Sequence, residues 1–268
     1  MRRLRSRPAA LSIAGSDSGG GAGLQADWAA FAALGVHGLS AVTCLTAQNP
    51  EAVRGVLPCR ADFLRAQLEA VFEAFPVRAI KTGMLYSAAL IRTTAETLAR
   101  HAAGIPLVVD PVMVATSGSR LLKPAALRAL TEELLPRATV ITPNRDEASV
   151  LLGRPLRELA DLREAARGLH GRFGCAALVK GGHCPEAGEA VDVLWDGRRE
   201  LLLRAPFHSG AGAHGSGCAL AAALAAGLAR GDSLPRAVRR AKAHVSGCIA
   251  HRVRVGRHET LNHFAAVK

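Results

Sequence analysis

Aromatic residues are scarce in this sequence, and so is lysine. Phe, Trp and Tyr make up 4% of the 268 residues, and only five of the 34 basic residues are lysines. The formal net charge of +12 would ordinarily suggest a nucleic-acid partner. Single strands need aromatic platforms on which their bases stack, however, and here the arginines are scattered along the whole chain. We therefore expect no nucleic-acid partner and attribute the charge to solvated surfaces and a general attraction for anionic ligands.

Long apolar runs and paired cysteines are also missing. No run of about 18 uncharged apolar residues occurs, so we expect no membrane partner. We do not expect the basic start of the chain to be an export signal, because the apolar residues 9–14 end at Gly15-Ser16-Asp17 and no cleavage site follows. The six cysteines form no Cys-x-x-Cys pair and no zinc-like grouping with histidine. A reducing cytoplasm, with most thiols buried, is the expected compartment.

Short apolar runs alternate with longer stretches of helical period, which is typical of βα units around a largely parallel sheet. The expected strands are residues 11–14, 39–44, 79–82, 107–109, 140–141 and 177–179, followed by a hairpin of 191–195 and 200–204. The expected helices are residues 24–34, 62–74, 88–103, 124–135, 145–152, 159–172, 217–229 and 234–250. No repeat or linker divides the chain, so we expect a single domain over residues 1–268, with loosely ordered tails at 1–8 and from about 252 to 268.

Two glycine-rich segments precede expected helices. The first, residues 14–27, only loosely matches a dinucleotide fingerprint, because no acidic residue follows a second strand about 20 residues on. This argues against a nicotinamide dehydrogenase. In the second, Gly215, Ser216 and Gly217 stand at a helix start whose N–H groups would hold an anion. Cys218 follows, and a thiol there should have a lowered pKa. The alternative is a glycine-rich turn in which Cys218 fills space.

Polar side chains follow three expected strands, and the carboxyl ends of parallel strands line one crevice. Asp110, and Glu147 with Asn144 near it, offer the hard oxygen ligands that suit a water-rich Mg²⁺ site. Lys180 suits a phosphate oxygen. Taken singly, each of these residues also fits a helix cap or a surface salt bridge.

Seven motifs occur in a fixed order. They are Gly15-Ser16-Asp17 through Gly20-Gly21-Ala22-Gly23-Leu24-Gln25-Ala26-Asp27, Leu45-Thr46-Ala47-Gln48-Asn49, Lys81-Thr82-Gly83-Met84-Leu85, Asp110-Pro111-Val112-Met113, Pro143-Asn144 with Glu147, Lys180-Gly181-Gly182-His183, and His214-Gly215-Ser216-Gly217-Cys218. From about residue 11 to residue 249 the chain resembles the hydroxymethylpyrimidine/phosphomethylpyrimidine kinases of thiamine biosynthesis.

The resemblance implies a ribokinase-like α/β fold, with a mainly parallel central sheet flanked by helices on both faces and assembled as a homodimer. It also implies the use of ATP and Mg²⁺. The expected reaction phosphorylates the hydroxymethyl group of 4-amino-5-hydroxymethyl-2-methylpyrimidine and then converts the monophosphate to the diphosphate.

The resemblance further implies a role for each matched residue. The substrate positions are Gln48, Asp27, Met84 and Val112; the nucleotide positions are Lys180, Asn144 and Glu147; the metal positions are Glu147 and Asp110; the anion hole is Gly215, Ser216 and Gly217; and the base is Cys218. The amide of Gln48 can pair with a ring nitrogen and an exocyclic amine together. The segment 207–213 departs from the Lys/Asn/Thr pattern often seen in the family.

Two alternatives stay open. Pyridoxal presents a ring hydroxymethyl group to the same anion hole, so the chain could be a pyridoxal kinase of the same superfamily. It could also be a non-catalytic, pyrimidine-binding sensor, which would bind its ligand without ATP turnover.

Overall fold

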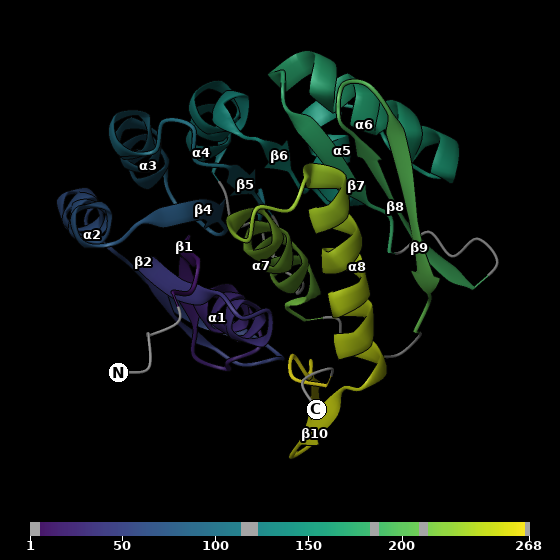
Figure 1. Ribbon diagram of the computed structural model, residues 1–268, viewed down its shortest axis with the longest axis horizontal. Helices are drawn as coiled ribbons and strands as arrows, with labels where there is room; N and C mark the ends of the chain where they lie inside the picture. Colours follow the sequence, from purple (N-terminus) through teal and green to yellow (C-terminus); the bar gives the residue numbers. More distant parts are fainter. Residues whose placement is uncertain (1–5, 114–122, 183–187, 209–213, 266–268) are drawn as a thin grey trace.

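The computed structural model describes residues 6–113, 123–182, 188–208 and 214–265 and is built around one large sheet (Figure 1). Its strands are Ala9–Asp17 (β1), His37–Gln48 (β2), Val53–Pro58 (β3), Val77–Thr82 (β4), Leu107–Val109 (β5), Val140–Ile141 (β6), Ala176–Lys180 (β7), Glu189–Trp195 (β8) and Glu200–Pro206 (β9). The strand order is β3-β2-β1-β4-β5-β6-β7-β8-β9. Strands Val253–Val255 (β10) and His258–Thr260 (β11) form a separate antiparallel pair.

The centre of the sheet is parallel and its margins are antiparallel. Strands β2, β1, β4, β5, β6 and β7 run in one direction, whereas β3 pairs antiparallel with β2, and β8 pairs antiparallel with both β7 and β9. The chain builds outward from β1 to β2 on one side and from β1 to β4 on the other. This reversal at β1 is a topological switch point, where α/β sheets form a crevice beyond their strand ends.

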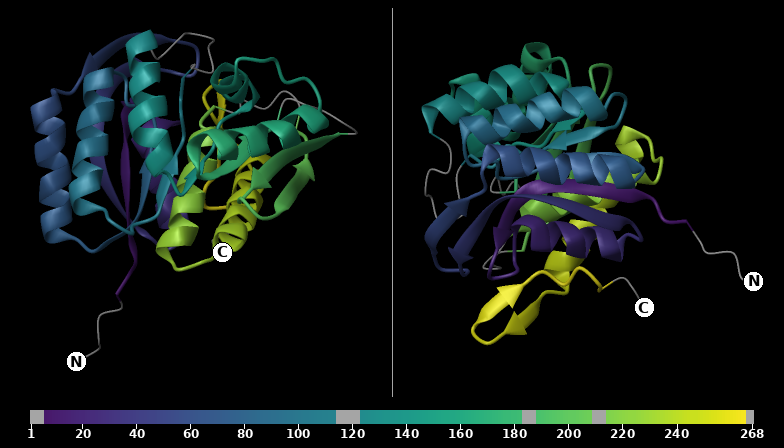
Figure 2. Two further views of the ribbon diagram at one scale, coloured as in Figure 1. Left: turned by 90° about the horizontal axis from the view of Figure 1, so that it is seen from above. Right: turned by 90° about the vertical axis from the view of Figure 1, so that its left-hand side faces the viewer.

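Helices cover both faces of the sheet (Figure 2). Their bounds are Gly23–Ala33 (α1), Ala61–Ala74 (α2), Ala88–His101 (α3), Pro124–Ala129 (α4), Arg145–Leu152 (α5), Leu159–Phe173 (α6), Ser216–Ala229 (α7) and Leu234–Ala250 (α8). One core cluster joins the sheet to α2, α3, α4, α5 and α6, and the other joins it to α1, α7 and α8. Leu11 and Ile13 of β1 face the first cluster and Ala10 faces the second, as the two-residue period of a strand requires.

The expected α/β architecture is therefore confirmed, but two local expectations are wrong and one strand was missed. Residues 124–135 form α4, then a π-helical turn over Leu130–Leu134 and a 3₁₀ turn over Leu135–Arg137, rather than one α-helix. Strand β3 was not expected at all. The segment from residue 252 was expected to be loosely ordered, but β10 and β11 make it a hairpin.

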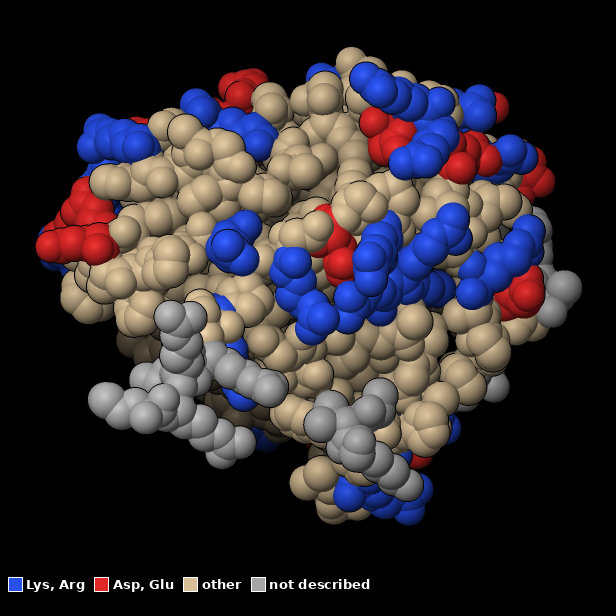
Figure 3. All heavy atoms as spheres, in the orientation of Figure 1, with Lys and Arg blue, Asp and Glu red and all other residues tan. Residues whose placement is uncertain are grey.

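Basic and acidic side chains are interspersed on the face shown in Figure 3. On α8, Arg236 and Arg240 both pair with Asp232, with N···O distances of 3.2 and 3.0 Å. Among the described residues, no helix combines the length and the apolar composition needed to cross a bilayer.

Candidate active site

A cavity of about 790 Å³ lies where the central strands end, beside the starts of α5 and α7 and one side of α8. This volume falls within the range of small-molecule sites. Eleven of the twelve residues predicted for the site border it. They are Gln48, Met84, Asp110, Val112, Asn144, Glu147, Lys180, Gly215, Ser216, Gly217 and Cys218. Sequence positions 48 to 218 thus meet at one place, as the switch-point argument predicts.

Asp27 is the exception and corrects the prediction that it contacts the substrate. Its side chain is fully buried on α1, where both carboxylate oxygens accept from the Lys81 ammonium at 2.9 and 2.8 Å. The Ser12 hydroxyl donates to the same carboxylate. Asp27 therefore has no surface left for a ligand. It neutralises Lys81 instead, and this charge holds the pKa of Lys81 above its ordinary value although burial works in the opposite direction.

The turn after β1 is organised by the carboxylate of Asp17. This carboxylate accepts from the backbone N–H groups of Gly19, Gly21 and Ala22 at 2.8 to 3.1 Å, and Nε2 of His214 lies 3.1 Å from it. Burial works to raise the pKa of Asp17, but these hydrogen bonds outweigh it and bring the pKa below its ordinary value. An ionised Asp17 thus joins the first glycine-rich segment to the second.

The second glycine-rich segment begins α7 in a conformation that needs glycine. Gly215 caps the helix with φ +81°, and a Cβ there would lie 1.8 Å from the carbonyl oxygen of Gly21. At Gly217 a Cβ would lie 3.1 Å from Nζ of Lys180. The absence of two side chains therefore lets one loop close on the other and lets an ammonium approach the first turn of α7. Backbone N–H groups and a cation together make a site for a phosphate.

Cys218 is the third residue of α7 and borders the cavity. The lowered pKa expected for this thiol is wrong, because burial raises the pKa of Cys218 to about 11. The charge of Lys81 and a hydrogen bond from the Gly23 backbone lower the pKa, but they offset burial only in part. Position at a helix start is therefore a smaller influence here than desolvation.

Asp110, Lys180 and Glu147 form a charged group on one wall of the cavity. Nζ of Lys180 lies 3.0 Å from Asp110, whose carboxylate also accepts from the Thr142 hydroxyl at 3.3 Å. Glu147 accepts from the backbone N–H groups of Met113 and Asn144 at 3.1 and 2.9 Å. Burial and the neighbouring charge of Asp110 raise the pKa of Glu147, and Lys180 opposes them.

Asn144 and Glu147 also form a capping box at the start of α5, since the Asn144 amide oxygen accepts from the Glu147 backbone at 2.8 Å. The helix-cap interpretation of these two residues is therefore realised. It does not exclude a ligand, because each carboxylate oxygen has a second lone pair. Both residues border the cavity as well.

Gln48 also borders the cavity, where it ends β2, and its amide nitrogen lies 3.4 Å from Nε2 of His214. Met84 and Val112 border the same cavity. Val112 has φ +41°, which is strained for a β-branched residue and costs on the order of 1–3 kcal/mol. Such strain is concentrated at ligand sites, which fits the predicted position of Val112 beside the substrate.

Sequence reasoning missed three residues of this site as individual participants, namely Asp17, Lys81 and His214. All three stand in the motifs that carry the resemblance, and all three border the cavity. Lys81 contacts Asp27 across 54 residues of sequence, and His214 contacts Asp17 across 197 residues. Such contacts are not visible in a linear pattern. The structure describes the segment 207–213 only as far as His208. The departure of residues 209–213 from the Lys/Asn/Thr pattern of the family therefore lies outside the described part of the chain.

Comparison with known proteins places this arrangement among vitamin kinases. The family described as phosphomethylpyrimidine kinase matches residues 17–263. The hydroxymethylpyrimidine/phosphomethylpyrimidine kinase of Streptomyces coelicolor is 49% identical over 242 residues, which cover 90% of this chain and 88% of that protein.

Two solved structures are similar in both sequence and fold. An ADP complex of Bacillus subtilis pyridoxal kinase superimposes with a TM-score of 0.90 and 36% identity, over 98% of this chain and 99% of that one. The Staphylococcus aureus pyridoxal kinase with AMP-PCP and pyridoxal gives a TM-score of 0.88 and 33% identity, over 98% of this chain and 95% of that one.

Proposed function

This chain belongs to the phosphomethylpyrimidine kinase family, and we propose that it uses ATP to phosphorylate hydroxymethylpyrimidine and then its monophosphate, in thiamine biosynthesis. The observation that carries the proposal is the meeting of an amide, an ammonium and a glycine-rich helix start in one cavity. The amide of Gln48 fits an aminopyrimidine, and the start of α7 with Lys180 fits the phosphoryl group. The cavity therefore offers a binding group for the pyrimidine ring and another for the phosphoryl group that is transferred.

The phosphoryl group is stabilised by fixed charges in this proposal. The free N–H groups at the start of α7 would donate to an anion bound there, and Nζ of Lys180 lies close to Gly217. Phosphoryl transfer has a loose transition state, so positioning and charge stabilisation supply most of the rate. These groups are held before the substrate arrives, because Gly215 packs against the backbone of Gly21.

Cys218 is the proposed base. Its thiolate would take the proton of the substrate hydroxyl as that oxygen bonds to phosphorus and the bond from phosphorus to ADP breaks. Because the pKa of Cys218 is about 11, only a small fraction of the thiol is ionised near neutral pH. The ammonium of Lys81 favours the thiolate and is the largest of the influences that lower this pKa.

Mg²⁺ would be held by Asp110 and Glu147, and it would neutralise charge on the nucleotide phosphates. The residues fit the ion, because two carboxylates border the cavity and the charge of Asp110 works against ionisation of Glu147. A divalent cation would relieve that repulsion. Mg²⁺ usually keeps several waters, so the backbone hydrogen bonds of Glu147 are compatible with this role.

Gln48 is the proposed specificity residue. Its amide stands beside His214, which Asp17 holds in place. An amide offers a donor and an acceptor side by side, and the aminopyrimidine ring presents the complementary pair. Met84 and Val112 supply apolar contacts to the ring in this proposal.

A pyridoxal kinase is the second candidate, because the two solved structures similar to this chain carry that description. ATP consumption with hydroxymethylpyrimidine, its monophosphate and pyridoxal, measured under identical conditions, separates the candidates. We expect turnover with both pyrimidines and a kcat/KM for pyridoxal lower by about 10²-fold or more. Turnover with pyridoxal alone would assign the pyridoxal kinase, and ligand binding without ADP release would assign the sensor.

We further propose that the chain acts as a single domain, in a homodimer, in the cytoplasm. Leu45 and Leu57 stand opposite each other on β2 and β3, and they are 52% and 67% exposed. A second copy would cover this apolar pair, which sits at a sheet edge that is open to pairing. The five described cysteines are free thiols, as a reducing compartment requires. Light scattering of the wild type and of Leu57→Asp tests the dimer, and the variant should be monomeric.

A further inference from the structure

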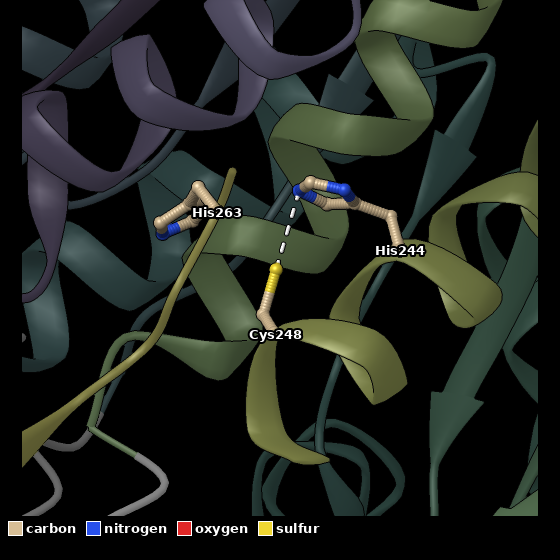
Figure 4. A group of neighbouring side chains, drawn as sticks. All are labelled: His244, Cys248 and His263. Carbon is tan, nitrogen blue, oxygen red and sulfur yellow. Dashed lines mark hydrogen bonds between the residues drawn. The ribbon is translucent and has the colours of Figure 1, made fainter. Parts of the chain in front are cut away.

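A second group of chemically reactive side chains lies near the carboxyl end of the described chain (Figure 4). His244 and Cys248 both stand on α8, and His263 follows β11. Nε2 of His244 lies 3.5 Å from Sγ of Cys248, and the rings of His244 and His263 have centroids 5.7 Å apart. One ligand atom from each of the three residues falls within 4.8 Å of the others. The sequence predicted no zinc-like grouping of cysteine with histidine, and the structure corrects this.

His263 carries an unsatisfied polar atom. Its side chain is only 8% exposed, and Nδ1 has no hydrogen-bond partner among the described residues. A buried nitrogen left without a partner is destabilising unless something else binds it. A neutral imidazole offers a lone pair at one ring nitrogen, and Nδ1 of His263 is available to a ligand.

We propose that His244, Cys248 and His263 bind one divalent d-block ion of the zinc class, with water in the fourth position. Two imidazoles and a thiolate are ligands of the right softness for Zn²⁺. Positions 244 and 248 are one helical turn apart, which puts two ligands on the same face of α8. On binding, three metal–ligand bonds form, the ion loses waters, and the thiol proton of Cys248 goes to solvent.

The geometry is close to that of an occupied site. Tetrahedral zinc, with bonds of about 2.0–2.3 Å, places its ligand atoms about 3.3–3.7 Å apart. The contact of His244 with Cys248 already has this spacing at 3.5 Å. The other ligand-atom distances are at most 4.8 Å, so closing around an ion needs a contraction of no more than about 1.5 Å.

An ion at this place would join the C-terminal segment to the wall of the active site. The backbone N–H of Asn262 donates to the Cys248 carbonyl at 3.3 Å, so the segment already rests on the last turns of α8. The same helix lends Lys242, Val245 and Ser246 to the cavity. The ion would therefore hold α8 in position through its ligands, and it would not contact the reacting groups.

Cobalt titration tests the site directly on the full chain. Co²⁺, added with excess Mg²⁺ to occupy carboxylates, should bind as one equivalent and give the thiolate charge-transfer band and strong visible bands of a tetrahedral site. Zn²⁺ should then displace it. Cys248→Ala should lose the charge-transfer band, and His263→Gln should weaken binding by at least about 100-fold. Cys59→Ala and Cys218→Ala are matched controls and should keep the band.

Circular dichroism establishes that each variant is folded. His263 lies outside α8, so His263→Gln decides the matter even if the Cys248 variant does not fold. A folded wild type that gives no thiolate band overturns the proposal. So does a band that persists in Cys248→Ala, or a Co²⁺ affinity that is unchanged in His263→Gln. These outcomes are independent of the kinase assay, because none of them measures turnover.

Discussion

Replacing Cys218 by alanine tests the proposed base, and the structure predicts how the effect depends on pH. The pKa of about 11 leaves ~10⁻⁴ of the thiol ionised at pH 7 and ~10⁻² at pH 9. If the thiolate accepts the substrate proton, the wild-type kcat should rise about tenfold per pH unit over this range. The alanine variant lacks this group, so its kcat should lose that slope.

The ratio of wild-type to variant turnover gives the magnitude. General bases contribute roughly 10²–10⁴-fold, and the ionised fraction grows a hundredfold between pH 7 and pH 9. We therefore expect a ratio of about 10² at pH 7 that approaches 10⁴ at pH 9. The affinity for the aminopyrimidine should change little, because the proposed ring contact is made by the amide of Gln48, which this substitution leaves in place.

The assay is steady-state kcat at saturating ATP and aminopyrimidine between pH 7 and pH 9, together with the alkylation rate of Cys218 measured by mass spectrometry. Cys175→Ala is the matched control: Cys175 is buried, its pKa is also raised to about 11, and it does not border the cavity. This control should keep the wild-type slope. A turnover ratio that is constant with pH, or an alanine variant as active as the wild type, would remove Cys218 from the mechanism.

Three further substitutions address the other roles. Gln48→Met should lower kcat/KM for the aminopyrimidine by about 10²-fold or more, because a ring built for hydrogen bonds loses its partner, and discrimination against pyridoxal should fall with it. Glu147→Gln should reduce turnover and move the Mg²⁺ dependence to higher concentration while the pyrimidine still binds; unchanged turnover at low Mg²⁺ would assign the role to Asp110. Asp27→Asn should lower the free energy of unfolding by about 3–5 kcal/mol, because it leaves a fully buried Lys81 without its counter-charge. If Asp27→Asn instead changes KM for the pyrimidine and urea unfolding shows no loss of stability, Asp27 contacts the substrate after all.

Sequence patterns predicted the buried central strands well. Strand β1 is apolar and buried almost throughout, as a central parallel strand should be, and it was found. Strand β3 was missed because it contains Gly55 and Pro58 and is mostly exposed, so it has neither the composition nor the alternation of a strand. Its pairing with β2, which extends past its parallel neighbours, is what makes it a strand.

The site was predicted by position more successfully than by charge state. Strand ends and helix starts can be located from patterns, and this placed eleven residues around one cavity. The burial of a side chain depends on what packs over it. Asp27 and Cys218 were therefore misjudged for the same reason. Asp27 is buried in an ion pair with Lys81, and desolvation dominates the pKa of Cys218. His214 and Asp17 are 197 positions apart in the sequence, so no local pattern revealed their contact.

The contact of Asp17 with His214 also has a consequence for synthesis of the protein. The two residues are 197 positions apart, yet the first glycine-rich turn takes part of its order from the second. At about 5–20 residues per second, a ribosome needs roughly 10–40 s to add the intervening chain. During that interval β1 can pair with β2 and β4, but the turn that follows it lacks the histidine and the backbone on which Gly215 will rest. The anion-binding turn can therefore be completed only after α7 has been synthesised, and a chain released before α7 would carry the first half of the site without the residues that close it.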